Sequence, residues 1–315
     1  MEIVDFNGKQ TLVTGGAGFI GSHLVDGLLE RGARVRVLDN FATGRRENLA
    51  HCIERIELVE GDIRDVAMCH RCMDGVDYVF HEAALGSVPR SMMDPATSID
   101  VNIGGTANVF AAARDAKVKR VVYASSSSVY GDSERLPKKE GHEGKPLSPY
   151  ALTKWVDEEL ADVFGRCFGL ELVGLRYFNV YGPRQDPNGP YAAVIPRFFA
   201  ACMKGESPVI YGDGTQSRDF TFVLDVVRAN LLAASAPSEG VCGRAFNVGA
   251  GGATSVNDLA RAIIEVTGAK VQPQHEPPRA GDVPFSRADT EDASRLLGFV
   301  ATVGLDEGIL RTRPY

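Results

Sequence analysis

Short runs of β-branched and aliphatic residues alternate with stretches of helical periodicity through the first half of the chain. Five such apolar runs are found at residues 10–15, 34–39, 55–62, 76–83 and 119–126. Between them, apolar residues recur three and four positions apart, for example in segments 19–31 and 95–116, and this spacing predicts helices. Strands that alternate with helices in this way predict a doubly wound α/β fold, in which helices cover both faces of a parallel sheet.

The pattern becomes irregular beyond residue 176. Segments 181–190 (YGPRQDPNGP) and 211–220 (YGDGTQSRDF) are rich in Gly, Pro and Asp, and they predict loops and short helices that cap the sheet and select a ligand. The apolar run 244–251 predicts another core strand that returns to the sheet. The chain is therefore expected to fold as two interleaved parts. These are a first domain at residues 1–177 with a returning segment near 219–250, and a smaller lobe at residues 178–315.

Composition and charge indicate a globular protein and limit its partners. The 315 residues are 44% hydrophobic, which is enough for one large core or two smaller ones that share an interface. The formal net charge is −7, and basic residues are mixed with acidic ones, so we expect no nucleic-acid partner. No apolar run is long enough to cross a bilayer, and the N-terminal segment lacks the features of a signal peptide. We therefore expect no membrane partner and a cytoplasmic location.

Six cysteines are scattered along the chain, and only Cys69 and Cys72 lie close together in the sequence. This pair has no second pair that would complete a zinc site, so we expect no metal. The scattered cysteines indicate a reducing compartment.

A glycine-rich turn follows the first expected strand and precedes the first expected helix. The sequence VTGGAGFIG places Gly15, Gly18 and Gly21 three residues apart. Glycines at this spacing let the backbone turn tightly and approach a pyrophosphate, which then faces the N-terminus of the helix. The second strand ends at Asp39, where a carboxylate can bind an adenosine ribose and repel a 2′-phosphate, so the segment predicts NAD rather than NADP. Asp62, after the third strand, is either an adenine contact or a turn-forming residue.

Two polar residues at the start of a later helical segment are candidates for proton transfer. In SPYALTKWVDEEL, Tyr150 and Lys154 are four residues apart and lie on one face of a helix. Most such pairs are solvated surface residues. A free tyrosine has a pKa of about 10, so a tyrosine base near neutral pH needs about 4 kcal/mol of stabilisation from positive charge. Four serines at 125–128 lie at the carboxyl edge of the expected sheet, where α/β proteins bind ligands, although serines there can also merely form a turn.

The combination of these motifs resembles the extended short-chain dehydrogenase/reductase family, and in particular its nucleotide-sugar epimerases. The resemblance extends over essentially the whole chain and includes TGGAGFIG, SSSSVYGD, SPYALTK and LRYFNVYGPRQDPNG. Tyr150 and Lys154 match the YxxxK pair of that family, and Ser126 matches its catalytic serine or threonine. The resemblance implies a Rossmann domain that binds NAD at residues 1–177 and a lobe that binds a UDP-sugar at residues 178–315.

The resemblance also assigns contacts for both ligands. For NAD it implies Gly15, Gly18, Phe19, Ile20, Gly21, Asp39, Asn40, Asp62, Ile63, Ala83, Ala84, Tyr150, Lys154 and Tyr177. For the UDP-sugar it implies Gly86, Ser87, Ser126, Ser127, Asn179, Ala193, Val194, Arg218, Arg279, Asp282 and Ser286. Guanidinium groups suit a diphosphate because their forked donors match phosphate oxygens. The resemblance further implies a homodimer, with helices near 95–116 and 148–168 at its interface.

The implied reaction is epimerisation at C4 of the sugar through a transient 4-keto intermediate, with no net redox change. Tyr150 would remove the proton of the 4-hydroxyl through Ser126 or directly, and Lys154 would hold the nicotinamide ribose. Related sugar dehydratases, and in part uronate decarboxylases, carry acidic residues where this chain has Ser127 and Ser128. Elimination would therefore lack its acid and base here.

Two positions favour a 2-N-acetylated sugar by the same resemblance. Ser286 stands where hexose-specific epimerases carry a tyrosine, and Gly86 and Ser87 stand where they tend to carry a lysine. We therefore expect UDP-N-acetylglucosamine as the substrate, with UDP-glucose as a further one. The alternatives are a UDP-glucose-only enzyme, a UDP-glucuronate 4-epimerase, which typically lacks an asparagine like Asn179, and a net NAD-dependent nucleotide-sugar oxidoreductase.

Overall fold

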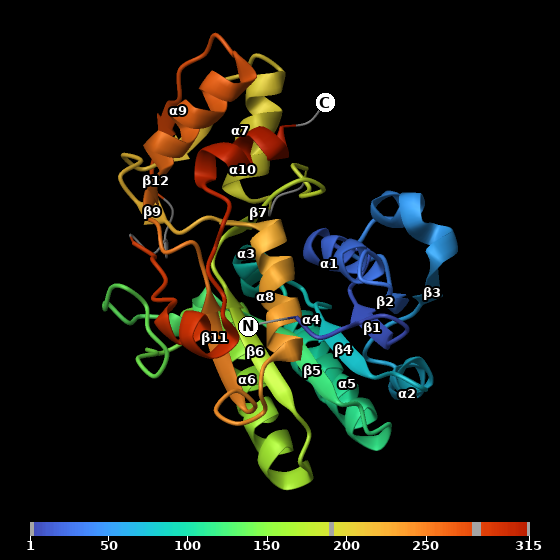
Figure 1. The fold of residues 1–315 in the computed structure, drawn as a ribbon. Coiled ribbons are helices and arrows are strands. Elements are labelled where there is room, and N and C mark those ends of the chain that lie inside the picture. The colour runs from blue at the N-terminus through green and yellow to red at the C-terminus, as the bar shows by residue number, and fades with distance from the viewer. Residues whose placement is uncertain (1–2, 189–191, 279–284, 314–315) are drawn as a thin grey trace.

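The computed structural model describes residues 3–188, 192–278 and 285–313, and it shows a larger part built on one sheet and a smaller lobe beside it (Figure 1). All neighbouring strands of the main sheet are parallel. Their spatial order is β11 (Arg244–Val248), β6 (Leu172–Tyr177), β5 (Arg120–Ser126), β4 (Tyr78–His81), β1 (Gln10–Thr14), β2 (Arg34–Asp39) and β3 (Ile56–Glu60). This order confirms the doubly wound α/β fold. β11 lies beside β6, so the chain does return to the sheet at residue 244. The domain boundary at residue 177 remains a prediction.

The strands β3 and β4 are shorter than the apolar runs from which they were predicted. β3 covers five residues and β4 four. The residues that follow them, among them Gly61, Glu82 and Ala83, line a cavity at the carboxyl edge of the sheet. The sheet ends early at this edge because its backbone turns to form the ligand site.

Two hydrophobic cores cover the two faces of the sheet, because successive residues of each strand point to opposite faces. Leu12 of β1, for example, belongs to one core and Val13 to the other. The first core contains α1 (Phe19–Leu29), α8 (Val223–Ser235), the 3-10 segment η1 (Arg46–Arg55) and the π-helical turn η4 (Ala293–Leu297). The second contains α2 (Val66–Met73), α5 (Gly105–Asp115) and α6 (Pro149–Phe168).

The helical segment expected at 95–116 is continuous but irregular. It consists of α4 (Pro95–Ile99), the π-helical turn η2 (Asp100–Gly104) and α5, and the short helix α3 (Val88–Met93) precedes it. Asn102 lies in the π turn, where its side chain accepts a hydrogen bond from the Leu85 backbone (2.8 Å) and donates one to Thr153 of α6 (3.0 Å). The π turn thus ties the loop after β4 to the helix that carries Tyr150 and Lys154.

The smaller lobe has its own hydrophobic core and is more regular than the sequence pattern predicted. It contains α7 (Val194–Met203), α9 (Val256–Thr267) and α10 (Leu305–Thr312). Short strand pairs connect it: β8 (Val209–Tyr211) with β13 (Gln274–Glu276), β9 (Ser217–Arg218) with β12 (Thr254–Ser255), and β7 (Val180–Tyr181) with β10 (Thr221–Phe222). The expectation of loops and short helices was wrong for α9, which has 12 residues. Its buried residues Val256, Leu259, Ala260 and Ile263 form one apolar face.

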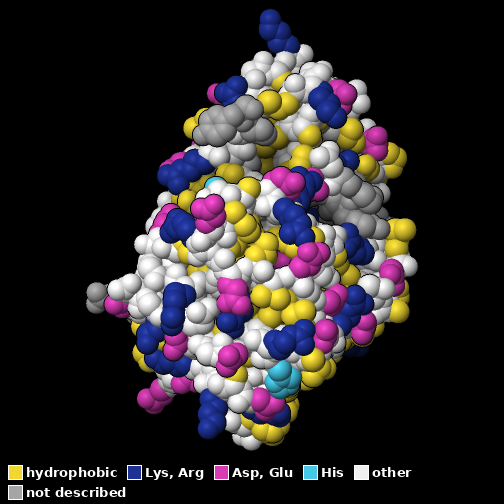
Figure 2. All heavy atoms as spheres, turned by 90° about the vertical axis from the view of Figure 1, so that its right-hand side faces the viewer, with side chains coloured by type: hydrophobic (Ala, Val, Ile, Leu, Met, Phe, Trp, Pro, Cys, Tyr) yellow, Lys and Arg dark blue, Asp and Glu magenta, His cyan; other side chains and the backbone are white. Residues whose placement is uncertain are grey.

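Charged residues of both signs are interspersed on the face shown in Figure 2, which is the right-hand side of Figure 1. This pattern provides no extended basic field on that face. Among the residues that the structure describes, no helix is long and apolar enough to cross a membrane.

Candidate active site

The glycine turn after β1 is held against the end of β4. Gly15 has a φ of +69°, and a Cβ atom at this residue would lie 2.7 Å from the backbone nitrogen of Ala83. A Cβ atom on Gly21 would lie 2.2 Å from the carbonyl oxygen of Gly15. Helix α1 begins after Gly18, and no side chain caps it. The turn therefore presents backbone N–H groups at a helix N-terminus, which suits the pyrophosphate of NAD.

Asp39 is fixed at the end of β2 by two backbone hydrogen bonds. Its carboxylate accepts one from Ala17 (2.9 Å) and one from Phe41 (2.8 Å). Burial raises the pKa of Asp39, and these two N–H donors oppose that effect. The carboxylate is thus held rigidly beside the glycine turn, with acceptor positions left for ribose hydroxyls.

A cavity of about 450 Å³ runs along this edge of the sheet and brings together most of the residues predicted to contact NAD. These are Gly15, Gly18, Phe19, Ile20, Gly21, Asp39, Asn40, Ile63, Ala83 and Ala84. Asp62 is not among the lining residues. Its carboxylate accepts hydrogen bonds from Arg64 and Asn40, and the contact with Arg64 lowers the pKa of Asp62. Asp62 therefore contacts Asn40, which lines the cavity, but does not line the cavity itself.

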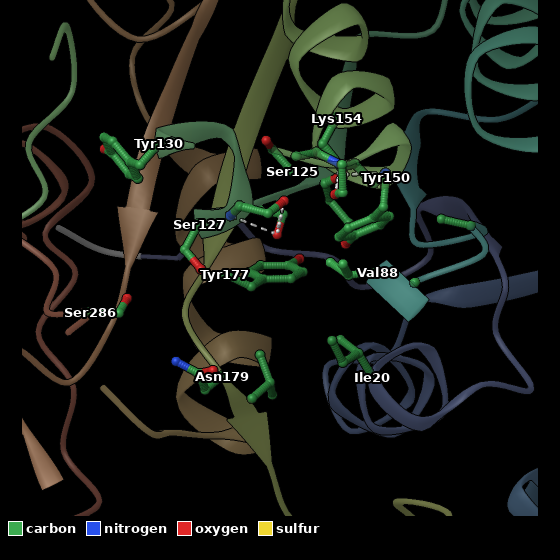
Figure 3. Close-up of a pocket in the computed structure, with 18 of the residues that line it drawn as sticks. Ile20, Val88, Ser125, Ser127, Tyr130, Tyr150, Lys154, Tyr177, Asn179 and Ser286 are labelled. Carbon is green, nitrogen blue, oxygen red and sulfur yellow. Dashed lines mark hydrogen bonds between the residues drawn. The ribbon is translucent and has the colours of Figure 1, made fainter. Parts of the chain in front are cut away.

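A second cavity, of about 670 Å³, adjoins the first. Figure 3 shows residues that line it. Phe19, Ile20, Glu82, Ala84 and Gly86 line both cavities, so the two form one continuous site. The second cavity also contains the predicted residues Ser126, Ser127, Tyr150, Lys154, Tyr177, Asn179, Arg218 and Ser286. These come from β5 and the 3-10 segment after it, from α6, from β6 and the link between β6 and β7, from β9, and from a loop near residue 286. Most of these elements are far apart in the sequence.

Tyr150 is positioned by the start of α6. Pro149 occupies the first turn of the helix, and the Ser148 side chain accepts a hydrogen bond from the Ala151 backbone (3.1 Å), which caps the helix. The backbone N–H of Tyr150 donates to the Ser91 hydroxyl on α3 (3.0 Å). These contacts leave the phenol of Tyr150 in the cavity, on the side opposite Asn179 (Figure 3).

Lys154 is buried one turn after Tyr150. Its Nζ donates to the carbonyl oxygen of Ala124 (2.9 Å) and to the carboxylate of Asp157 (3.1 Å). Burial alone would lower the pKa of Lys154, but the charge and hydrogen bond of Asp157, together with the charges of Tyr150 and Glu82, outweigh it, and the pKa is raised. An ammonium has three hydrogens, so these two contacts leave one for a ligand in the cavity.

Ser126 lies at the end of β5 and begins the short 3-10 segment η3 (Ser127–Tyr130). Its hydroxyl oxygen accepts hydrogen bonds from the Ser128 backbone (3.1 Å) and the Ser128 hydroxyl (2.9 Å). Because the oxygen of Ser126 is an acceptor in both contacts, its own hydrogen is available to a substrate oxygen.

A buried polar network fixes the elements beneath the cavity. The guanidinium of Arg176 on β6 contacts Glu158 of α6 (2.7 Å), Glu143 of the loop before α6, and the hydroxyl of Tyr130 (3.0 Å). The Ser125 hydroxyl also donates to Glu158 (2.5 Å). Arg176 thus joins the strand, the helix and the loop that together form one wall of the site.

The remaining substrate predictions fall into three groups. Asn179 and Arg218 line the larger cavity and also a smaller one of about 200 Å³, which Val194 lines too. Ala193 precedes α7 beside that cavity but is not among its lining residues, and Ser87 caps α3 by accepting a hydrogen bond from the Arg90 backbone (3.2 Å). Arg279 and Asp282 lie outside the described residues.

Glu82 was not predicted from the sequence as a site residue. It follows β4, lines both large cavities, and accepts a hydrogen bond from the hydroxyl of Tyr177 (2.6 Å). Burial raises the pKa of Glu82 to about 7, although Tyr177 and Lys154 act in the opposite direction. The available signal was a carboxylic acid directly after a fully buried strand, at the edge where the ligand was expected.

Comparisons with known proteins extend over almost the whole chain. The NAD dependent epimerase/dehydratase family matches residues 11–249. The chain is 42% identical over 307 residues to UDP-glucose 4-epimerase of Mycolicibacterium smegmatis, a match that covers 96% of this chain and 97% of that protein. Among solved structures, it is similar to UDP-N-acetylglucosamine 4-epimerase from Methanobrevibacter ruminantium M1 in complex with UDP-N-acetylmuramic acid (TM-score 0.91, 40% identity, 97% of each chain). It is also similar to Thermus thermophilus UDP-glucose 4-epimerase in complex with NAD (TM-score 0.86, 37% identity, 96% of this chain and 97% of that chain).

Proposed function

The chain belongs to the NAD-dependent epimerase/dehydratase family, and from this membership we propose that it interconverts UDP-N-acetylglucosamine and UDP-N-acetylgalactosamine and also acts on UDP-glucose. NAD is its cofactor. The main support for a C4 epimerase is the junction of the two cavities. A nucleotide cleft there opens into a space that contains Tyr150, Lys154 and Ser126.

In this proposal, NAD held in the cleft would supply a reversible hydride acceptor for C4 of the sugar, so that the hydride can be returned to the opposite face. Tyr150, as a phenolate, accepts the proton of the 4-hydroxyl. Ser126 orients that hydroxyl through its own hydrogen, and the ammonium of Lys154 stabilises the phenolate. The return step reverses the proton transfer at Tyr150.

The residues directly after Ser126 support epimerisation rather than elimination. Elimination of water needs an additional acid and base near the sugar. The two residues after Ser126 are Ser127 and Ser128, whose hydroxyls are much weaker acids and bases than carboxyl groups, and both line the cavity. After transfer of the hydride, the keto sugar would therefore turn and be reduced again.

Two small residues support the choice of an N-acetylated sugar. Ser286 lines the larger cavity, and its backbone N–H donates to the Ser217 carbonyl (3.1 Å), which holds the loop in place. Gly86 lines both cavities, and a Cβ atom built on it would meet nothing within 4 Å. An acetamido group needs such additional volume.

Proton NMR of the purified protein with UDP-N-acetylglucosamine, UDP-glucose and UDP-glucuronate, each alone, tests the proposal through the anomeric signals of the 4-epimers. We expect both of the first two to be converted, the N-acetylated sugar faster. Ser286→Tyr should lower kcat/KM for UDP-N-acetylglucosamine at least tenfold and leave that for UDP-glucose within about threefold. Ser286→Ala, which keeps the side chain small, should leave both unchanged. If only UDP-glucuronate is converted, UDP-glucuronate is the substrate in place of UDP-N-acetylglucosamine. If none of the three is converted, the proposed epimerase activity is refuted.

The proposal includes a homodimer and, from the sequence alone, a cytoplasmic location. α3, α4 and α6 expose large apolar side chains, which favour burial against another copy. They include Met92, Met93, Ile99, Leu152, Trp155, Val163 and Phe168. Light scattering on the native protein should give twice the chain mass of 33.9 kDa, and Trp155→Glu should shift the mass toward the monomer. A monomeric native protein would refute the dimer.

A further inference from the structure

Glu82 lies where the cofactor cleft meets the catalytic cavity. The glycine turn and Asp39 define the adenosine and pyrophosphate end of the cleft. The hydride-accepting end must therefore lie at the other end, near Tyr150. Glu82 lines both cavities at their junction, so its carboxyl group borders the space through which the hydride-accepting end must pass.

A chain of hydrogen bonds orients this carboxyl group. Asn230 of α8 donates from Nδ2 to the hydroxyl of Tyr177 (2.8 Å), and that hydroxyl donates to Oε1 of Glu82 (2.6 Å). Burial raises the pKa of Tyr177 well above its ordinary value, so the phenol remains a donor. Tyr177 lines the catalytic cavity, and Figure 3 shows its ring between Ser127 and Val88.

Other ionisable groups line the same two cavities, among them Asp39 and Arg64 of the cofactor cleft. Lys154 and Tyr150 of α6 line the catalytic cavity with it, and Arg90 of α3 lines the cofactor cleft. Lys154 favours the ionised form of Glu82, and burial favours the neutral form.

We propose that Glu82 sets the charge beside the hydride-accepting end of the cofactor, so that its carboxylate stabilises the positively charged NAD⁺ against reduction and its neutral acid does not. The positive charge of the nicotinamide ring disappears on reduction. A neighbouring carboxylate therefore stabilises the oxidised form selectively, and more strongly in a partly buried site than in water. In the proposed epimerisation, this favours return of the hydride to the keto sugar.

The test uses holoenzyme with bound NAD⁺ and no sugar, so it does not depend on the proposed substrate. Cyanoborohydride supplies the hydride: a B–H bond breaks, its electron pair forms a C–H bond on the nicotinamide ring, and NADH absorbance reports the rate. At about pH 8, where a group with a pKa of about 7 is about nine-tenths ionised, we expect Glu82→Gln to be reduced about tenfold faster than wild type. That ratio corresponds to about 1.4 kcal/mol.

The pH dependence of the reduction rate distinguishes an effect of the Glu82 charge from a general structural effect of the substitution. The wild-type rate should rise as the pH falls from about 8 to about 6 and approach the Glu82→Gln rate, which should stay flat. Tyr177→Phe keeps the charge but removes the hydrogen bond that stabilises the carboxylate, so its rate should still depend on pH, with a midpoint at higher pH.

Three results would overturn the proposal. They are equal rates for Glu82→Gln and wild type at about pH 8, a ratio that does not change with pH, and a Tyr177→Phe profile that is as flat as that of Glu82→Gln. If Glu82→Gln does not retain NAD, the test rests on the pH profile of the reduction rate of the wild type. A wild-type rate that does not rise as the pH falls from about 8 to about 6 would then refute the proposal.

Discussion

Replacing Asp157 with asparagine tests how the buried cation of the site is maintained. The Asp157 carboxylate lies 3.1 Å from Nζ of Lys154, and both side chains are almost fully buried (1% and 4% exposed). Burial raises the pKa of Asp157 to about 6, against the effect of Lys154, so the pair is mostly ionised at pH 7. Asp157→Asn keeps the shape of the side chain and removes its charge.

The loss in free energy of unfolding can be worked out for two limiting cases, in which Lys154 of the variant either keeps or loses its proton. At 3.1 Å the attraction between unit charges is about 5 kcal/mol at an effective dielectric constant of about 20. If Lys154 instead loses its proton in the variant, the cost at pH 7 is also about 5 kcal/mol, because a free lysine has a pKa of about 10.4. Removal of one partner of a buried pair costs about 3–5 kcal/mol in general. We therefore expect Asp157→Asn to lose about 3–5 kcal/mol at pH 7, or about 5–8 °C in Tm if the 315 residues unfold as one unit.

The loss of stability caused by Asp157→Asn should depend on pH, and its direction follows from the pKa of Lys154. In the wild type, the pKa of Lys154 is raised, so its contribution to stability is present at neutral pH and disappears as the pH rises through the folded-state pKa. In the variant, burial without Asp157 lowers that pKa, and discharging the lysine costs only about 2 kcal/mol at pH 9. The difference in unfolding free energy between wild type and variant should therefore shrink from pH 7 to pH 9, as measured by denaturant unfolding.

Asp162→Asn is the matched control on the same helix. Asp162 pairs with Arg166 (2.8 Å), but both side chains are exposed and the pair is screened by water, so its loss should leave the unfolding free energy almost unchanged. Asp157→Asn should also lower kcat, because a less charged Lys154 stabilises the Tyr150 phenolate poorly. Equal stability of the two variants, or a loss of stability in Asp157→Asn that grows with pH, would contradict this role of Asp157.

Three further changes test other parts of the site. Tyr150→Phe should reduce kcat at least about 10³-fold while NAD stays bound, as followed by NMR and absorbance, and retention of activity would contradict its role as the base. Gly21→Ala should release NAD on gel filtration, because its Cβ would lie 2.2 Å from the Gly15 oxygen, and full NAD content would show that the turn can adapt. Arg176→Met should cost about 3–5 kcal/mol in denaturant unfolding, because it leaves Glu158 buried without its cation, and a loss below about 1 kcal/mol would contradict this.

The parts of this protein that could be predicted from sequence depend on local geometry. The order of strands and helices, the glycine turn with Asp39, and the pair Tyr150 and Lys154 each follow from residue spacing along one or two elements. The doubly wound fold could be predicted for the same reason, because alternating strands and helices allow few topologies. The helix α9 was the exception, since its Gly-rich flanks concealed an apolar face.

The sequence by itself determined which residues could bind NAD and which could exchange a proton. The ends of the strands place the NAD-binding residues, and the helix period places Tyr150 and Lys154 on one face. Only the tertiary structure decided which distant residues meet them. Glu82 joins Tyr177, Arg176 joins Glu143 and Glu158, and Asp62, which does not itself line the cavity, pairs with Asn40. These contacts join β4 to β6, the loop before α6 to β6, and the end of β2 to the loop after β3. Spacing along the chain cannot specify them, because they depend on how side chains from separate elements fill one shared volume.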